Sequence, residues 1–191
     1  MIIITKVMRI TTTQLMRAVP DTDRVRVGDF VRVFNEYSEK FRINTPLRVV
    51  HFLAQCWHES GCLKYTEELA SGKQYEGRKD LGNVQPGDGV KFKGRGFIQI
   101  TGRSNYLAYK NSGYCVGDLM SHPEWLSVNP GNTKSAMWFW WKKGLSALAD
   151  TDNGMNSSEV CKRITKRVNG GQNGIAQRLY YMRRFKKEFG I

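Results

Sequence analysis

Two segments of the chain combine residue types that can carry out acid–base chemistry. His58-Glu59-Ser60-Gly61 places a carboxylate where an apolar helical pattern ends, and the run from Lys93 to Thr101 supplies a glycine-rich turn with polar side chains. Desolvation beside apolar walls favours the protonated form of a carboxyl group, which suits a general acid. The two segments together predict a site at which Glu59 donates a proton.

Polar residues within the second segment are spaced to act together. Gln99 and Thr101 are two positions apart, so their side chains share one face if this segment is a strand. Arg95 stands between Gly94 and Gly96, and we expect it to order the turn or to pair with a carboxylate. The spacing favours a common site for Gln99 and Thr101.

The elements that must position these residues are mostly helical. Thr45-Pro46 resembles an N-cap followed by proline at the first helical position, and the helix over 47–58 ends at Ser60-Gly61. Apolar spacing or capping residues predict further helices over 12–19, 27–40, 105–110, 132–148, 156–168 and 174–189. The glycine-rich stretch 69–96 indicates turns, with short strands over 90–93 and 97–100. These elements predict a mainly α-helical α+β fold with a small central sheet.

Aromatic residues are concentrated in the segment 132–148. Trp138, Trp140 and Trp141 run round a helix, which favours core packing over a sugar-stacking role. The helix-end His58 is likewise expected to pack beside the site rather than to act as a second acid.

Length and hydropathy indicate one domain. We expect an N-terminal extension over 1–7 and a single domain over 8–191. No apolar run approaches the roughly 18 residues that span a bilayer, and Lys6 interrupts the apolar start. We therefore expect no membrane insertion, and a protein made in the cytoplasm without a signal peptide.

The charge points to an anionic partner. Thirty basic residues outnumber 17 acidic ones, which gives a formal net charge of +13 spread over the whole chain. Such a field attracts nucleic acid, anionic lipid or an anionic cell wall. Four cysteines without CxxC spacing and three histidines predict no metal site and no cofactor.

Several motifs, in this order, resemble family 19 glycoside hydrolases, and within them the chitinase-like endolysins of phages. The resemblance covers roughly residues 8–190. It is carried by His58-Glu59-Ser60-Gly61, Tyr75-Glu76-Gly77-Arg78-Lys79-Asp80-Leu81-Gly82-Asn83, Pro86-Gly87-Asp88-Gly89, the run from Gly94 to Tyr106, Arg167-Val168-Asn169-Gly170-Gly171 and Arg178-Leu179-Tyr180-Tyr181. It implies a lysozyme-like, two-lobed, mainly helical fold with a small antiparallel sheet lining a sugar-binding cleft. It also implies cleavage of β-1,4 bonds in N-acetylglucosamine-containing polymers with inversion at the anomeric carbon.

The same resemblance suggests residue roles. Glu59 matches the general acid, and Thr101 matches a hydroxyl residue that helps to hold the attacking water. Gln99, Asn105 and Asn169 match sugar-binding amides, and Arg178 matches a cleft arginine. Tyr106 is compatible with both a sugar contact and core packing, and we take it as a candidate sugar contact.

More than one carboxylate is a candidate for the general base. Inversion requires a second carboxylate roughly 6.5–9.5 Å from the acid, which leaves room for water. Glu68 corresponds by position to the second acid of endolysin-type members and follows Glu59 by nine residues. A continuous helix would turn these two side chains apart, but we expect Gly61 to break it. Glu67 and Glu76 are alternatives, and Glu76 is also a candidate substrate contact.

Three functions remain open on this basis. The first is an endolysin-type hydrolase that cuts peptidoglycan, acts as a monomer and reaches the wall after release from the host cytoplasm. The second is a chitinase acting on poly-N-acetylglucosamine. The third, from another class, is a basic glycan- or nucleic-acid-binding protein, although the sequence shows no recognisable nucleic-acid module and we expect no nucleic-acid partner.

Overall fold

The computed structural model describes residues 8–115 and 117–191. The expected extension over 1–7 lies outside the described residues. The α-helices are α1 (Thr12–Ala18), α2 (Arg24–Tyr37), α3 (Pro46–Glu59), α4 (Asp88–Lys91), α5 (Arg103–Lys110), α6 (Gly131–Lys142), α7 (Leu145–Ala149), α8 (Ser157–Asn169) and α9 (Ile175–Phe189). Short 3₁₀ turns are η1 (Lys73–Tyr75), η2 (Lys79–Leu81) and η3 (Pro123–Ser127).

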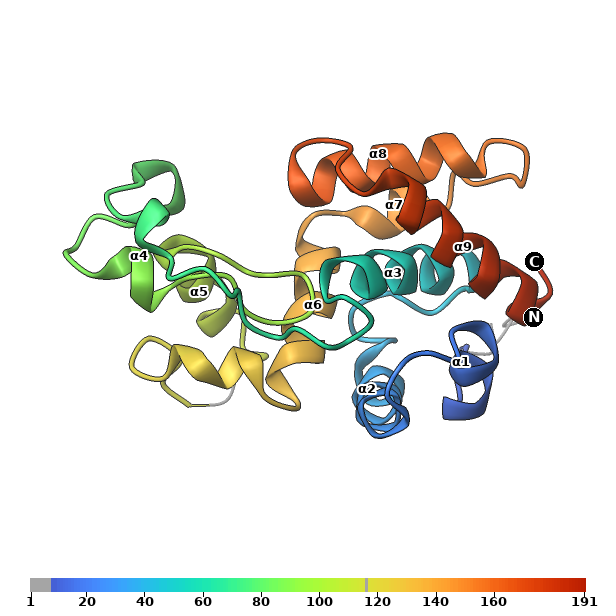
Figure 1. Cartoon of the computed structure of the whole chain (residues 1–191), viewed down its shortest axis with the longest axis horizontal. Coiled ribbons are helices and arrows are strands. Elements are labelled where there is room, and N and C mark those ends of the chain that lie inside the picture. The colour runs from blue at the N-terminus through green and yellow to red at the C-terminus, as the bar shows by residue number, and fades with distance from the viewer. Residues whose placement is uncertain (1–7, 116) are drawn as a thin grey trace, which may run out of the picture.

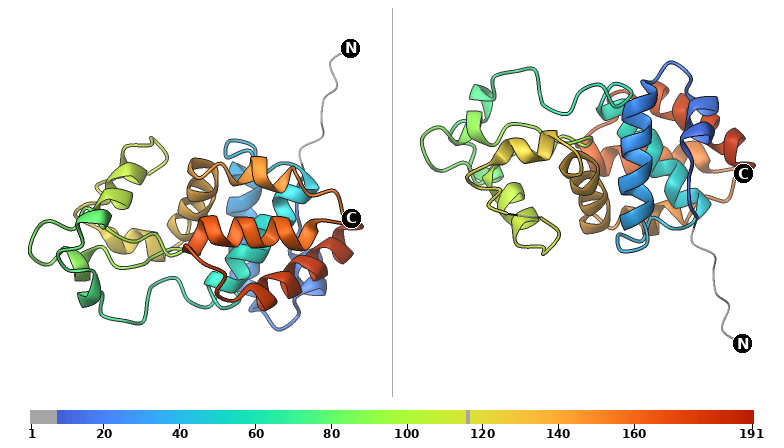
Figure 2. Two further views of the ribbon diagram at one scale, coloured as in Figure 1. Left: turned by 90° about the horizontal axis from the view of Figure 1, so that it is seen from above. Right: turned by 90° about the horizontal axis from the view of Figure 1, so that it is seen from below.

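The helices form two lobes of unequal size (Figure 1). The larger lobe contains α1, α2, α3, α7, α8 and α9, and the smaller lobe contains α4, α5 and η3, with α6 between them. Views from above and below show the same division (Figure 2). The predicted two-lobed, mainly helical architecture is therefore confirmed.

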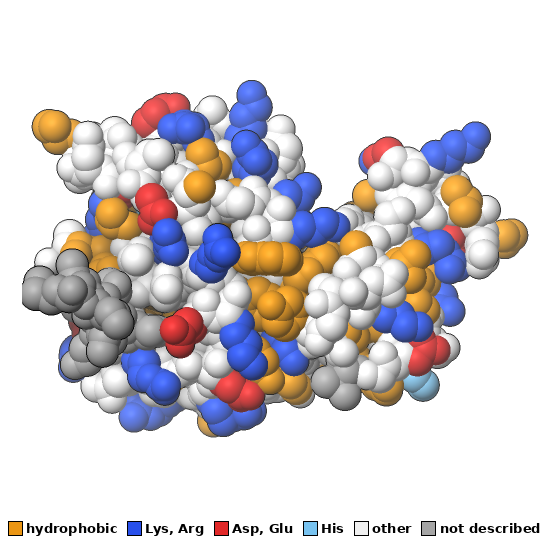
Figure 3. Space-filling view, turned by 180° about the vertical axis from the view of Figure 1, so that it is seen from behind, with side chains coloured by type: hydrophobic (Ala, Val, Ile, Leu, Met, Phe, Trp, Pro, Cys, Tyr) orange, Lys and Arg blue, Asp and Glu red, His pale blue; other side chains and the backbone are white. Residues whose placement is uncertain are grey.

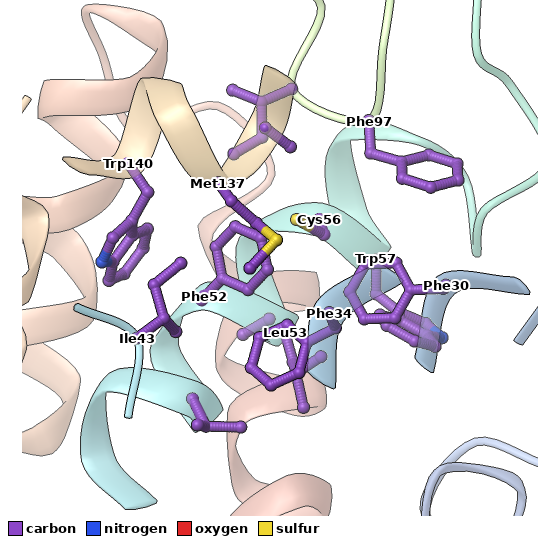
Figure 4. Packing of buried hydrophobic residues seen from close by; sticks show 14 of the residues in the cluster. Phe30, Phe34, Ile43, Phe52, Leu53, Cys56, Trp57, Phe97, Met137 and Trp140 are labelled. Carbon is purple, nitrogen blue, oxygen red and sulfur yellow. The ribbon is translucent and has the colours of Figure 1, made fainter. Parts of the chain in front are cut away.

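Helix α3 runs through the core of the larger lobe, and its inward side chains are fully buried. The rings of Phe30 and Trp57 meet edge to face with centroids 5.3 Å apart, and those of Phe52 and Trp140 do so at 5.5 Å (Figure 4). Phe97 belongs to the loop over 94–101, yet its ring centroid lies 5.9 Å from that of Phe30. Apolar burial therefore anchors this loop to the larger lobe.

The predicted antiparallel sheet does not form in the described residues. Pairing there consists of two isolated antiparallel bridges, Glu67 with Arg95 and Arg95 with Ile100. Residues 88–91 form α4 instead of the strand expected over 90–93. Gly96 and Gln99 have φ values of 80° and 53°, so the chain turns back on itself where the strand over 97–100 was expected. The β part of the predicted α+β fold is therefore wrong.

The helix expected over 132–148 is divided into α6 and α7. Gly144 has a φ of 64° and turns the chain between them, because a left-handed residue cannot continue a right-handed helix. Trp138 and Trp140 are buried as predicted, whereas Trp141, at the end of α6, is 43% exposed. None of the described helices combines the length and apolar character needed to cross a membrane.

Candidate active site

Glu59 is the last residue of α3, and local interactions fix where that helix ends. At its start, the Thr45 side chain caps α3 and Pro46 occupies the first position. At its end, the Ser60 hydroxyl donates to the Cys56 carbonyl at 2.6 Å and accepts from the Leu63 backbone amide at 2.9 Å. The chain therefore leaves α3 immediately after the carboxylate.

The three residues after Ser60 adopt an uncommon backbone conformation. Gly61, Cys62 and Leu63 have φ values of 55°, 62° and 60°. Left-handed geometry costs roughly 1–2 kcal/mol for each residue that carries a Cβ. The burial of Leu63 and the Ser60 hydrogen bonds hold this reversal. Gly61 thus breaks the helix as predicted, and Cys62 follows in the same strained turn.

A buried guanidinium holds the Glu59 carboxylate. Arg178 Nη2 donates to Glu59 Oε1, and Arg178 Nη1 donates to Gln55 Oε1, one turn earlier on α3. The Arg178 side chain is 1% exposed and that of Glu59 is 19% exposed. The pairing fixes the carboxylate while leaving one side of it open to a ligand. The sequence led us to expect apolar walls beside this carboxylate, and the structure adds a buried cation in contact with it.

Arg178 was predicted to contact substrate, and its burial contradicts that role. It acts instead through Glu59 and Gln55, and its Nε lies 3.4 Å from the Asn173 carbonyl oxygen. Gln55 was not predicted, although its position four residues before Glu59 places it on the same helix face.

Neighbouring His58 packs against the first turn of α9 and the glycine that precedes it. Its Nδ1 lies 2.6 Å from Gln177 Oε1, and a Cβ on Gly174 would come within 1.9 Å of the imidazole ring. Burial, followed by the charge of Arg178, lowers the pKa of His58. The expected packing role of His58 is confirmed.

The Glu68 carboxylate accepts three hydrogen bonds. Tyr75 Oη and Gln74 Nε2 each donate to Oε1 at 3.0 Å, and the Gly94 backbone amide donates to Oε2 at 3.2 Å. Burial and the bond to Glu68 raise the pKa of Tyr75. The carboxylate is therefore oriented toward the loop that carries Gln99 and Thr101. Tyr75 was part of a matching motif but had no predicted role.

Three side-chain oxygens meet beside Gly94. A Cβ on this residue would lie 2.8 Å from Gln99 Oε1, 3.2 Å from Thr101 Oγ1 and 3.3 Å from Glu68 Oε2. Only a residue without a side chain leaves this small volume open. Gln99 and Thr101 share a site as predicted, although a turn rather than a strand brings them together. The three oxygens are thereby gathered on one side of Gly94, and each can accept a hydrogen bond from a ligand.

A hollow of about 360 Å³ adjoins this group. Its polar lining includes Gln99, Thr101, Asn105, Asn169 and Tyr75, with Arg78 and Lys143 as its charged residues. Asn105 Nδ2 donates to the Thr101 carbonyl at 2.8 Å. The predicted amide residues therefore line one cavity. Its lining contains two cations and no carboxylate.

Asn169 ends α8 at the rim of this hollow. Gly170 caps the helix with a φ of 79°, as the Asn-Gly-Gly sequence predicts. Asn169 Oδ1 accepts from the Gly171 amide at 2.9 Å, and Nδ2 donates to the Asn173 carbonyl at 3.2 Å. That carbonyl also accepts from Arg178, so one short loop links Asn169 to the group that holds Glu59.

Two further residues that were predicted to contact substrate make hydrogen bonds to the protein backbone. Tyr106 is 0% exposed and its hydroxyl donates to the Lys93 carbonyl at 2.7 Å, so the predicted sugar contact is wrong. Both Glu76 oxygens accept backbone amides, from Gly87 at 2.7 Å and Gly89 at 2.8 Å. These bonds hold Glu76 against the start of α4, whereas Glu68 lies beside Gln99 and Thr101, so Glu68 is the better placed of the two candidate bases.

The third acidic candidate, Glu67, pairs with two cations. Arg95 Nη2 lies 3.0 Å and Lys93 Nζ 3.1 Å from Glu67 Oε1. The prediction that Arg95 pairs with a carboxylate is confirmed, and Glu68 remains the candidate base with a side chain in the oxygen group. In the described ranges, no three His, Cys, Asp or Glu side chains gather as metal ligands would.

Sequence comparison finds relatives, although no family model matches the chain. A Haemophilus influenzae glycosyl hydrolase family 19 domain-containing protein is 33% identical in an alignment 172 residues long, and the match covers 73% of this chain and 79% of the relative. The Arabidopsis thaliana endochitinase At2g43610 is 33% identical over 151 residues, covering 75% of this chain. The matched region spans 48% of that plant protein.

Solved structures share the fold at lower sequence identity. Chitinase C from Streptomyces griseus superposes with a TM-score of 0.64 at 19% identity, covering 94% of this chain and 92% of that one. A class IV chitinase from Zea mays gives a TM-score of 0.60 at 20% identity, covering 85% and 80%. At such identities the likeness concerns the fold alone.

Proposed function

This chain belongs to glycoside hydrolase family 19, and from that premise we propose that it cleaves the β-1,4 glycosidic bonds of bacterial peptidoglycan in the manner of an endolysin. Membership makes the protein an inverting glycoside hydrolase that acts on a polysaccharide. What we propose beyond membership is that peptidoglycan is the substrate and that individual residues have the roles described next.

The proposed reaction is a single displacement. Glu59 protonates the leaving glycosidic oxygen, and a water held beside Gly94 attacks the anomeric carbon from the opposite face of the sugar. Glu68 accepts the proton of that water, while Gln99 and Thr101 orient it. The sugar product carries an inverted anomeric hydroxyl. Glu68 then releases its proton to solvent and Glu59 takes one up, which restores both groups.

The oxygen group at Gly94 is the observation that carries this assignment. Glu68 Oε2, Gln99 Oε1 and Thr101 Oγ1 all lie 2.8–3.3 Å from one point beside Gly94 Cα. This gathering supports a water site on the open side of the group, with a carboxylate as one of its acceptors. General acid–base assistance of this kind contributes about 10²–10⁴-fold in rate.

Charge supports peptidoglycan over a neutral polymer. The chain carries a net charge of +13, and Arg78 and Lys143 are the charged residues that line the hollow. Peptidoglycan bears carboxylates on its peptide stems, whereas chitin has no charge to match these cations.

Chitin is the second candidate, because several relatives are endochitinases by name. Purified sacculi and colloidal chitin, assayed in parallel with the same enzyme preparation, test the choice. Release of soluble muropeptides supports the proposal, and mass spectrometry of their reducing ends identifies the sugar on each side of the cut. Cleavage of chitin with intact sacculi would refute it.

A further inference from the structure

We infer that a strip of four cations, which begins with Lys143 in the hollow and continues along α8 with Arg167, Lys166 and Arg163, binds the carboxylates of the peptide stems that hang from the glycan. This inference rests on the proposed function. It assigns to the enzyme a second contact with its polymer, outside the place where the glycosidic bond is cut.

The strip begins in the hollow and continues along α8. Lys143 lines the hollow together with Val168 and Asn169. Arg167 Nη1 lies 3.4 Å from the backbone oxygen of Lys143, which joins the ends of α6 and α8. Residues three and four apart are neighbours on a helix surface, so Arg163 and Lys166 extend the same face away from the hollow.

None of these cations is neutralised by the protein. All four side chains belong to exposed residues, and none pairs with an acid in the described part of the chain. Lys143 Nζ lies 5.6 Å from the Phe139 ring centroid, which is a weak contact for a charge. Glu159, the one acid on α8, lies a turn before Arg163 and forms no ion pair among the described residues.

The arrangement suits an extended polyanion. A helix rises about 1.5 Å per residue, so the cations are displayed at intervals over several ångströms from the rim outward. Seen from behind, Lys and Arg side chains run over the top of the larger lobe down to the notch between the lobes (Figure 3). Carboxylates spaced along a glycan that leaves the hollow past Lys143 would meet these charges in turn.

A charge-removal variant and a matched control test the strip. The strip variant carries Lys143→Gln, Arg163→Gln, Lys166→Gln and Arg167→Gln. The control removes four exposed cations on the α1, α2 and C-terminal side of the larger lobe (Figure 1), through Arg9→Gln, Arg24→Gln, Lys40→Gln and Lys187→Gln. The two proteins therefore have the same net charge.

Binding is measured by co-sedimentation with purified sacculi, free of phosphate-bearing polymers, in a Glu59→Gln background that prevents cleavage. Exposed ion pairs contribute roughly a factor of two each, so the strip variant should bind about tenfold more weakly than the parent. The control should stay within about threefold. On sacculi whose carboxyl groups have been amidated chemically, parent and strip variant should bind equally.

Equal binding of parent and strip variant to native sacculi would overturn the inference. Equal weakening in strip variant and control would also overturn it, because net charge would then explain the effect. The inference would also be overturned if the parent bound only walls that carry phosphate-bearing polymers and did not bind purified sacculi. Cleavage by the enzyme with Glu59 intact is measured separately: sacculi that are bound through the strip but never cut would refute the proposed function and leave the strip supported.

Discussion

The Glu59 carboxylate and the Arg178 guanidinium form an ion pair across 119 positions of the chain. Arg178 belongs to α9, is buried against α3 and also holds Gln55. Moving this cation away would leave buried polar atoms unpaired. The carboxylate is thereby fixed in position before any substrate binds.

Replacing Glu59 with glutamine should stop turnover while keeping the fold. The amide oxygen still accepts from Arg178, but the side chain has no acidic proton to donate, so kcat should fall by at least about 10²–10⁴-fold. Initial rates on sacculi and a thermal melt check this. Glu159→Gln, on the exposed first turn of α8, is the control and should keep its rate. Near-parental turnover in Glu59→Gln would exclude Glu59 as the acid.

Substitutions of Glu68 and Glu76 should affect different properties of the enzyme. Glu68→Gln removes the proposed base and should lower kcat by about 10²–10⁴-fold. Glu76→Gln weakens two hydrogen bonds to backbone amides and should reduce the free energy of unfolding by about 1 kcal/mol, because exposure limits the loss. Its kcat should stay within about tenfold of the parent's. The reverse pattern of rates would move the base to Glu76.

Gly94→Ala should inactivate the enzyme, although glycine contributes no catalytic side chain. The added Cβ would lie 2.8 Å from Gln99 Oε1 and would also crowd Thr101 and Glu68. The oxygens that orient the proposed water would have to shift, so we expect kcat to fall by about 10²-fold or more. Gly171→Ala is the matched control near the same hollow, because a Cβ there meets nothing within 4 Å. An active Gly94→Ala enzyme would show that the attacking water is held elsewhere.

Stability should fall as the pH drops from 7 to 5, and His51 should contribute to the slope. His51 is fully buried with Nε2 2.9 Å from Asp152 Oδ2, and burial lowers its pKa despite that carboxylate. The unfolded chain, with a histidine pKa of about 6.5, therefore takes up this proton first. The stabilisation is complete above about pH 6.5 and is lost as the pH falls, by up to about 1.4 kcal/mol per pH unit.

Denaturant unfolding at both pH values measures this slope. His51→Gln removes the titrating group and should flatten the pH dependence, while His122→Gln, at an exposed histidine, should leave it unchanged. An unchanged slope in His51→Gln would mean that other groups account for the acid sensitivity.

The positions of several site residues follow from local sequence. Thr45-Pro46 starts α3 and Ser60-Gly61 ends it, which fixes Glu59 at a helix terminus. Gly170 likewise ends α8 beside Asn169. Caps, prolines and left-handed glycines act within a few residues, so the printed sequence contains the information needed to predict them.

The sequence by itself determined the helical architecture and the position of the Glu59 carboxylate at the end of α3. The tertiary structure alone decided that Arg178 supports Glu59 instead of a sugar, that Tyr106 is buried, and that Glu68 meets Gln99 and Thr101 beside Gly94. Turn geometry at Gly96 and Gln99 also replaced the expected sheet. These outcomes depend on how segments far apart in the chain pack together. Hydrophobic periodicity specifies which face of a helix or strand is buried, but it does not specify which other element covers that face.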